Sequence, residues 1–299
     1  MFFLTQIIGL LVINIYSPTI SQTIDENGNQ INITSYNLPY GVEPPQDSTP
    51  QSSLFSIVIA IAFAVGLILV LMKLRSEIFL RIWFFIVVIL AISISFNAFL
   101  IKIPSSSLIA LAIAVPLAIL KIFKRNVIVH NLTELLIYPG IATIFVPLLS
   151  IWTGVLLLIL LSIYDMYAVW HIGFMQKMAK YQMEQVKVFP GFFLPYLDKG
   201  AKSNLNKLNL KNKSNPKSKK EKKIRVPVAI LGGGDIVFPI IMAGIVFRAL
   251  GVIPALIISI GATVALGLLL LKSEKKKAYP AMPFITIGIL IALGIVYLI

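Results

Sequence analysis

Cysteine is absent from the 299-residue sequence, and histidine occurs only twice, as His130 and His171. The absence of cysteine excludes a disulfide framework, an iron–sulfur cluster, thiolate-bound zinc and a cysteine nucleophile. Two histidines leave little material for a metal site. The sequence also contains neither the HExxH motif of zinc proteases nor the GxSxG motif of serine enzymes. We therefore expect no metal ion and no cofactor.

Charged residues are scarce as well, at 13% of the sequence, whereas a soluble domain carries about 25%. Apolar residues make up 58%, and the mean hydropathy is +0.92. The formal net charge of +14 is concentrated in short basic stretches between apolar segments. A nucleic-acid-binding protein would spread such charge over a hydrophilic surface, so we expect no nucleic-acid partner. The composition predicts an all-α, polytopic membrane protein.

Nine apolar segments are long enough, or nearly so, to cross the ~30 Å hydrocarbon core of a bilayer as helices. The predicted spans are residues 2–16, 54–72, 78–101, 107–122, 127–149, 151–173, 226–247, 250–271 and 279–299. The sequence therefore predicts a transmembrane bundle of about nine helices. The first segment is short, and residues 1–16 are either a true span or a signal peptide.

The distribution of Lys and Arg predicts the orientation of the bundle, because short loops rich in these residues stay cytoplasmic. Residues 17–53 contain neither Lys nor Arg and form a predicted extracytoplasmic loop. The alternating loops that carry the basic residues then lie in the cytoplasm. We expect a multi-pass integral membrane protein, located in the cell membrane if its source is prokaryotic, with a cytoplasmic N-terminus and an extracytoplasmic C-terminus.

A basic segment over residues 174–225 divides the chain into a six-span part, 1–173, and a three-span part, 226–299. Residues 174–188 fit either an amphipathic helix at the membrane surface or an extension of the sixth span. From Lys199 to Arg225 the sequence has eleven basic residues and one acid, Glu221. This composition predicts a disordered cytoplasmic linker close to the anionic headgroups of the lipid bilayer.

Two acids lie within apolar segments, Asp165 in the sixth span and Asp235 in the seventh. An intramembrane carboxylate costs at least about 2.5 to 3.5 kcal/mol to insert, which makes it a functional candidate. Counting from the flanking basic residues places both acids roughly 15 Å below the same membrane face at 1.5 Å per residue, so they can meet. A third acid, Glu134, lies near the start of the fifth span and is expected to snorkel or to pair with a base.

Two neighbouring carboxyls in a site of low dielectric do not both ionise easily, so one retains its proton. The charged partner can then take a proton from a shared water while the protonated partner donates to a scissile carbonyl. This is the chemistry of an aspartic protease. The alternative is a structural role, in which a buried acid bonds a polar neighbour such as Tyr164.

Two further motifs flank these acids. Gly232, Gly233 and Gly234 precede Asp235, and such a run favours local unwinding or close helix packing. On the glycines alone, packing is the simpler explanation, although loosened backbone could also pair with an extended substrate. The last span opens with Pro280, Ala281, Met282 and Pro283. The prolines predict either an irregular entry that lines the active site or a plain helix start.

Together these motifs resemble the presenilin and signal peptide peptidase family of GxGD intramembrane aspartyl proteases, in its archaeal presenilin-like branch. Tyr164-Asp165 matches the family's YD motif, Gly232 to Asp235 matches GxGD, and Pro280 to Met282 matches PAL with methionine in place of leucine. The resemblance implies that Asp165 and Asp235 are catalytic, and that Pro280 to Met282 shape the site. It also implies substrates that are transmembrane helices or signal-peptide remnants.

Three alternatives remain at this level. A prepilin-peptidase-like enzyme also uses a GxGD motif, but does not join it to a YD span and a proline-led final helix. A proton-coupled transporter or channel could use paired acids as a relay, although the division into six and three spans does not resemble two related halves. A catalytically inert scaffold leaves the matched acids unexplained. The motifs indicate neither the particular substrate nor the oligomeric state.

Overall fold

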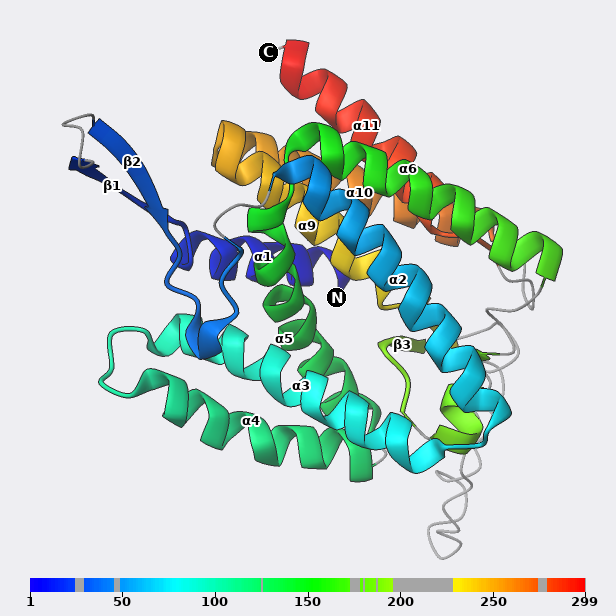
Figure 1. Ribbon diagram of the computed structural model, residues 1–299. Coiled ribbons are helices and arrows are strands. Elements are labelled where there is room, and N and C mark those ends of the chain that lie inside the picture. The colour runs from blue at the N-terminus through cyan, green and yellow to red at the C-terminus, as the bar shows by residue number, and fades with distance from the viewer. Residues whose placement is uncertain are drawn as a thin grey trace, which may run out of the picture.

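The computed structural model describes residues 1–24, 30–45, 49–124, 126–172, 178–179, 181–186, 188–195, 228–273 and 279–298. Helices dominate these residues (Figure 1). The main helices are α1 (Phe2–Ile15), α2 (Pro50–Lys73), α3 (Glu77–Leu100), α4 (Ser106–Phe123), α5 (Val127–Phe145), α6 (Ile151–Tyr167), α9 (Gly234–Leu250), α10 (Val252–Lys272) and α11 (Met282–Leu298). The predicted helical class is confirmed.

The helices coincide with the predicted apolar segments, but not all of them reach a full membrane span. Six described helices are long and apolar enough to cross a bilayer. These are α2, α3, α4, α5 extended by η2 (Val146–Leu148), α6 extended by the π-helix η3 (Ala168–Ile172), and α10. Helices α1, α9 and α11 have 14, 17 and 17 residues. Within the described residues, nine main helices therefore match the nine predicted segments, and six of them are long and apolar enough to cross a bilayer.

Two short hairpins interrupt the helical pattern and were not predicted. In the first, β1 (Thr19–Ile24) pairs antiparallel with β2 (Gln30–Ser35) and projects from the bundle (Figure 1). In the second, β3 (Gly191–Pro195) pairs antiparallel with β4 (Val228–Gly232). The segment predicted to begin the seventh span at residue 226 is therefore partly a strand. Its helix starts only at Gly234, because the glycines favour a break over helix continuation.

The basic segment between the two parts of the chain lies mostly outside the described residues. This holds for the predicted linker Lys199–Arg225 and, within the segment 174–188, for residues 174–177, 180 and 187. Within the latter, η4 (Gln182–Val186) is a π-helix. Its carbonyls are held by Arg81 of α3, whose Nε donates to the Val186 oxygen at 2.7 Å.

Helix α1 lies at the centre of the bundle, where it packs against α5 and α9 (Figure 1). The α3–α4 pair covers one side of α5, whereas α10 and α11 pack together on the far side of α9. Helix α6 contacts both α9 and α11. The Ser162 hydroxyl of α6 lies 2.8 Å from the Thr286 hydroxyl of α11, and both side chains are buried. This interhelical hydrogen bond sets the register between α6 and α11.

Helices α10 and α11 approach each other closely because glycines face each other across their contact. A Cβ added at Gly261 would lie 2.6 Å from the Ala292 Cβ and 2.7 Å from the Gly288 carbonyl oxygen. Small residues of this kind allow dispersion contacts between backbones, which drive helix association in lipid. The α10–α11 pair therefore depends on the absence of a side chain at Gly261.

We expect Gly261→Ala to lower the apparent melting temperature of the detergent-purified protein, because the added methyl group overpacks this contact at a cost of about 1–3 kcal/mol. Gly267→Ala is the matched control on the same helix, since no atom lies within 4 Å of its added Cβ. The control should melt at or slightly above the wild-type temperature. Equal melting temperatures for the two variants would contradict the packing argument.

Candidate active site

Asp165 lies in the last turn of α6, and its side chain is buried, with the residue 5% exposed. The helix begins with a capping box in which the Ser150 side chain accepts from the Thr153 N–H and Thr153 reciprocates. From this start, α6 runs as regular α-helix to Tyr167 and continues as the π-helix η3. Asp165 therefore stands next to a change of helical geometry, and such changes are frequent at functional sites.

The carboxyl of Asp165 is held by the N-terminus of α11. The Met282 N–H donates to Asp165 Oδ2 at 3.1 Å, and the Ala281 N–H also bonds this carboxyl. The Ala281 carbonyl accepts the first helical bond, from Ile285 N at 3.1 Å, so Ala281 is the N-cap of α11. The first N–H groups of a helix lack partners within it and carry partial positive charge. Asp165 supplies the partner from another helix.

The prolines around this N-terminus have a clear role in that arrangement. Pro280 is buried and precedes the helix, and Pro283 occupies its second position. Neither residue has an N–H, so the donors that remain at this point are those of Ala281 and Met282. Residues 279–281 are not helical. The irregular segment predicted before the last helix is thus present. The N–H groups of Ala281 and Met282, which have no partner within α11, bond Asp165.

Asp235 lies in the first turn of α9, directly after β4. The Gly232 N–H bonds its carboxyl, and a Cβ added at Gly232 would lie 3.2 Å from Asp235 Oδ2. A Cβ at Gly233 would lie 3.1 Å from the Tyr138 hydroxyl of α5. The glycine run therefore forms a tight strand-to-helix junction beside the acid. The glycines therefore serve mainly to form this junction. Close packing between helices, the simpler explanation from the sequence, is not their main role.

The two acids meet where α6 packs against α9. Their carboxyls are close enough to interact electrostatically. Asp235 is only partly buried, unlike Asp165. The prediction that residues 70 positions apart converge is thereby supported. Each carboxyl lies at the N-terminus of a helix, where backbone dipoles favour a negative charge. The pair can hold one proton and one negative charge.

The remaining predicted residues fall around this pair. Tyr164 precedes Asp165 on α6 and is half-buried. The hydrogen bonds described for Asp165 come from α11, in contrast to the structural alternative that gave this role to Tyr164. Glu134 does pair with a base, because its Oε1 lies 2.5 Å from Lys121 Nζ. Within the described residues, no group of three His, Asp or Glu side chains could hold a metal ion.

Sequence reasoning missed the strand β3 and the α5 side chains that contact it. The signal was the run Phe189 to Pro195, with its three phenylalanines, one leucine and flanking prolines, just before the basic segment. It is too short for a span and too apolar for a linker. Its pairing with β4 brings it beside Asp235.

Two converging carboxyls between the helices of an integral membrane protein are the defining feature of intramembrane aspartyl proteases. The chain belongs to the family described as signal-peptide peptidase, presenilin aspartyl protease, whose model matches residues 30–299. It is accordingly an intramembrane aspartyl protease. No curated protein matches the chain.

Two solved structures have a similar fold. The chain is similar to a presenilin family intramembrane aspartate protease solved in two crystal forms. In space group C222 the TM-score is 0.57, with 18% identity over 98% of this chain and 93% of the other. In space group P2 the TM-score is 0.60, with 18% identity over 100% and 95%. At this identity the likeness establishes the fold.

Replacing Pro280 tests whether the start of α11 supports the acids. We expect Pro280→Ala to lower the rate of peptide cleavage strongly with little change in melting temperature. Alanine permits α11 to extend backward and shift the N–H groups that hold Asp165, and a shift on the order of 1 Å can cost about a hundredfold in rate. Met282→Leu conserves volume and the backbone N–H, so it should resemble wild type. A fully active Pro280→Ala enzyme would exclude this segment from the active site.

Proposed function

We propose that Asp165 and Asp235 are the catalytic pair of this protease, and that it cleaves transmembrane helices or signal-peptide remnants within the bilayer. The observation that carries the assignment is the convergence of both carboxyls at one partly open site, with the α11 N–H groups on Asp165. Tyr164, Gly232, Gly233, Gly234, Pro280, Ala281, Met282 and Pro283 shape that site.

The reaction follows from the two environments. One carboxylate removes a proton from a water held between the acids, and the water oxygen attacks the scissile carbonyl carbon. The other carboxyl donates its proton to the carbonyl oxygen, which gives a tetrahedral intermediate. Collapse of this intermediate breaks the C–N bond, and the amine leaves with a proton from the carboxyl that received the water's proton. As the carbonyl re-forms, a hydroxyl of the intermediate returns its proton to the other carboxylate. Each acid thus alternates between donor and acceptor.

The β3–β4 hairpin provides a means of holding the substrate in extended form. Phe193 directs its N–H and C=O away from β4, since both bond the Asn131 side chain. In an antiparallel pair the opposite residue, Ile230, then also directs its N–H and C=O away from the hairpin. Ile230 is 44% exposed. A substrate segment can add to this edge as a further strand, a few residues before Asp235.

The orientation and the lipid contacts belong to the same proposal. We place the N-terminus in the cytoplasm and the C-terminus outside, because this arrangement keeps most basic loops inside. The site then opens toward the cytoplasmic face, and the basic segment before β4 contacts anionic headgroups there.

Removal of either carboxyl tests the catalytic pair. We expect Asp165→Asn and Asp235→Asn each to abolish cleavage of a model transmembrane peptide by the purified protein, with helicity near wild type, because an amide can replace neither the base nor the acid. A transition-state-analogue inhibitor of aspartic proteases should block the wild-type enzyme. More than a few per cent of residual activity in either variant would refute the assignment. Proton uptake into liposomes that needs both acids, without cleavage, would instead indicate a transporter.

Backbone methylation of the substrate tests the free edge of β4. Only alternate residues of an added strand direct their N–H groups at β4. Peptides methylated at single backbone nitrogens near the cleavage position should therefore be cleaved slowly at every second position and normally between them. Mass spectrometry of the products measures each rate. A uniform effect of methylation along the peptide would argue against strand addition.

A further inference from the structure

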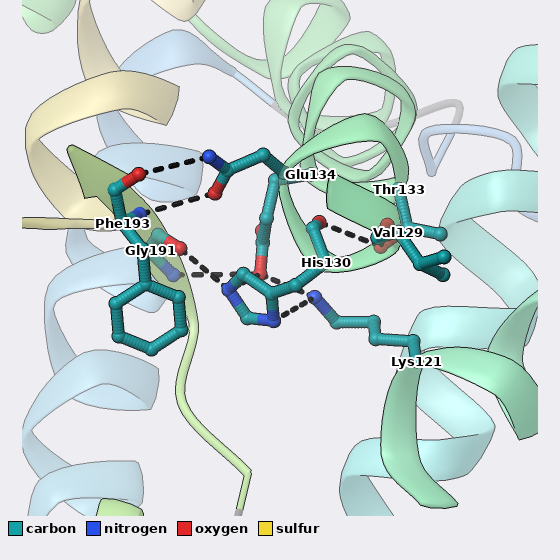
Figure 2. Close-up of polar contacts among 8 residues, drawn as sticks. Lys121, Val129, His130, Thr133, Glu134, Gly191 and Phe193 are labelled. Atoms are coloured by element: carbon teal, nitrogen blue, oxygen red, sulfur yellow. Dashed lines mark hydrogen bonds and ion pairs between the residues drawn. The ribbon is translucent and has the colours of Figure 1, made fainter. Parts of the chain in front are cut away.

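The outer edge of β3, which faces away from β4, is bonded to side chains of α5 at Gly191 and Phe193. His130 Nε2 donates to the Gly191 carbonyl at 2.8 Å, and the Gly191 N–H donates to Glu134 Oε1 at 3.4 Å. Two residues along, the Asn131 Nδ2 donates to the Phe193 carbonyl at 2.9 Å and its Oδ1 accepts from the Phe193 N–H at 3.1 Å. Figure 2 shows His130 and Glu134 reaching the strand at Gly191.

This pattern is the one that a third strand would make. In an antiparallel sheet every second residue directs both its N–H and its C=O to the same neighbour. Gly191 and Phe193 are such alternate residues, and each has both groups bonded to α5. A side-chain amide can imitate a strand because it offers one acceptor and one donor side by side. His130 and Glu134 share the same role at Gly191.

A buried ion pair between α4 and α5 stabilises the position of Glu134. Lys121 Nζ of α4 lies 2.5 Å from Glu134 Oε1, with the two side chains 3% and 1% exposed. Lys121 Nζ also lies 3.4 Å from His130 Nδ1, which fits a neutral imidazole that donates through Nε2. A carboxylate buried without such a partner would be unfavourable. Lys121 therefore holds Glu134 in place beside the strand.

A hydrogen bond next to β3 links the strand to the junction that precedes Asp235. The Pro190 carbonyl, next to Gly191, accepts from the Gly233 N–H at 3.1 Å. Gly233 is the N-cap of α9, two residues before Asp235. One turn further along α5, Tyr138 packs edge-on against Phe192, with ring centroids 5.8 Å apart. The same helix thus holds both the strand and the junction that places the carboxyl.

We propose that His130, Asn131 and Glu134 act as a surrogate third strand that fixes the register of the β3–β4 hairpin. They are positioning residues for Asp235, and they leave the β4 edge as the open edge for the substrate. This inference rests on the proposed catalytic role of Asp235. It assigns Glu134 a purpose beyond its ion pair with Lys121.

The test compares Asn131→Leu with Thr133→Val, in full-length purified protein. Both residues are buried on α5, but the Thr133 hydroxyl bonds only carbonyls of its own helix, those of Val129 and His130 (Figure 2). We expect Asn131→Leu to lower kcat on the order of tenfold to a hundredfold, with little change in KM, and to spread cleavage over additional peptide bonds. Thr133→Val should retain the wild-type kcat and cleavage position.

A second pair of variants covers the case in which Asn131→Leu does not fold. The His130 side chain is partly accessible, so substitutions there disturb the core less. His130→Leu removes the donor to Gly191, whereas His130→Gln keeps an amide N–H on a side chain of similar reach. We expect His130→Gln to restore most of the kcat that His130→Leu loses. Equal activity of these two variants would overturn the proposal.

Hydrogen exchange separates this inference from the catalytic assignment, because it does not depend on cleavage. Amides in residues 189–195 and 228–232 should exchange faster in Asn131→Leu than in wild type, with α10 unchanged. Normal exchange in the hairpin, or a loss of activity that only follows the amount of folded protein, would overturn the surrogate strand. If the hairpin loosens as expected but Asp235→Asn remains active, the surrogate strand stands and the catalytic role of Asp235 fails.

Discussion

A carboxyl inside a bilayer has to obtain its hydrogen bonds from the protein, because hydrocarbon offers none. In this chain the N–H groups that begin α11 meet that need for Asp165. The arrangement satisfies two requirements at once, since the first N–H groups of a buried helix also need acceptors. The other features of the site follow from it. The prolines remove competing donors, and the Ser162–Thr286 hydrogen bond holds α6 and α11 in register.

Asp235 solves the same problem by a different route. It lies at a strand-to-helix junction, where Gly232 contributes an N–H and leaves space for the carboxyl. A helix passing through this point would have had its N–H groups bonded internally. The glycines therefore serve the acid by ending regular structure beside it. Both carboxyls therefore lie at the N-terminus of a helix, Asp165 at that of α11 and Asp235 at that of α9, where the backbone dipoles favour a negative charge.

Much of this architecture was predictable from the sequence, for identifiable reasons. Apolar length located the helices, and the cost of burying Asp165 and Asp235 singled them out. The β3–β4 hairpin was not predictable in the same way. Its strands are separated by the basic segment, and their pairing joins residues such as Phe192 and Leu231 that no local pattern connects. The role of Asn131 was equally hidden, since a single amide in a helix carries no periodic signal. The start of α9 was misplaced because Val228 to Leu231 is as apolar in a strand as in a helix.

Each of the two acids is held in place by residues that lie outside its own part of the chain. Asp165 belongs to the N-terminal helices but is held by α11, which is synthesised after both acids. Asp235 belongs to the C-terminal helices, but its junction is held by Tyr138 of the N-terminal part and by Pro190, which directly precedes β3. A ribosome-bound chain that lacks α11 therefore contains both carboxyls without a complete site. On the ribosome, the N–H groups that hold Asp165 therefore become available only after α11 has been synthesised.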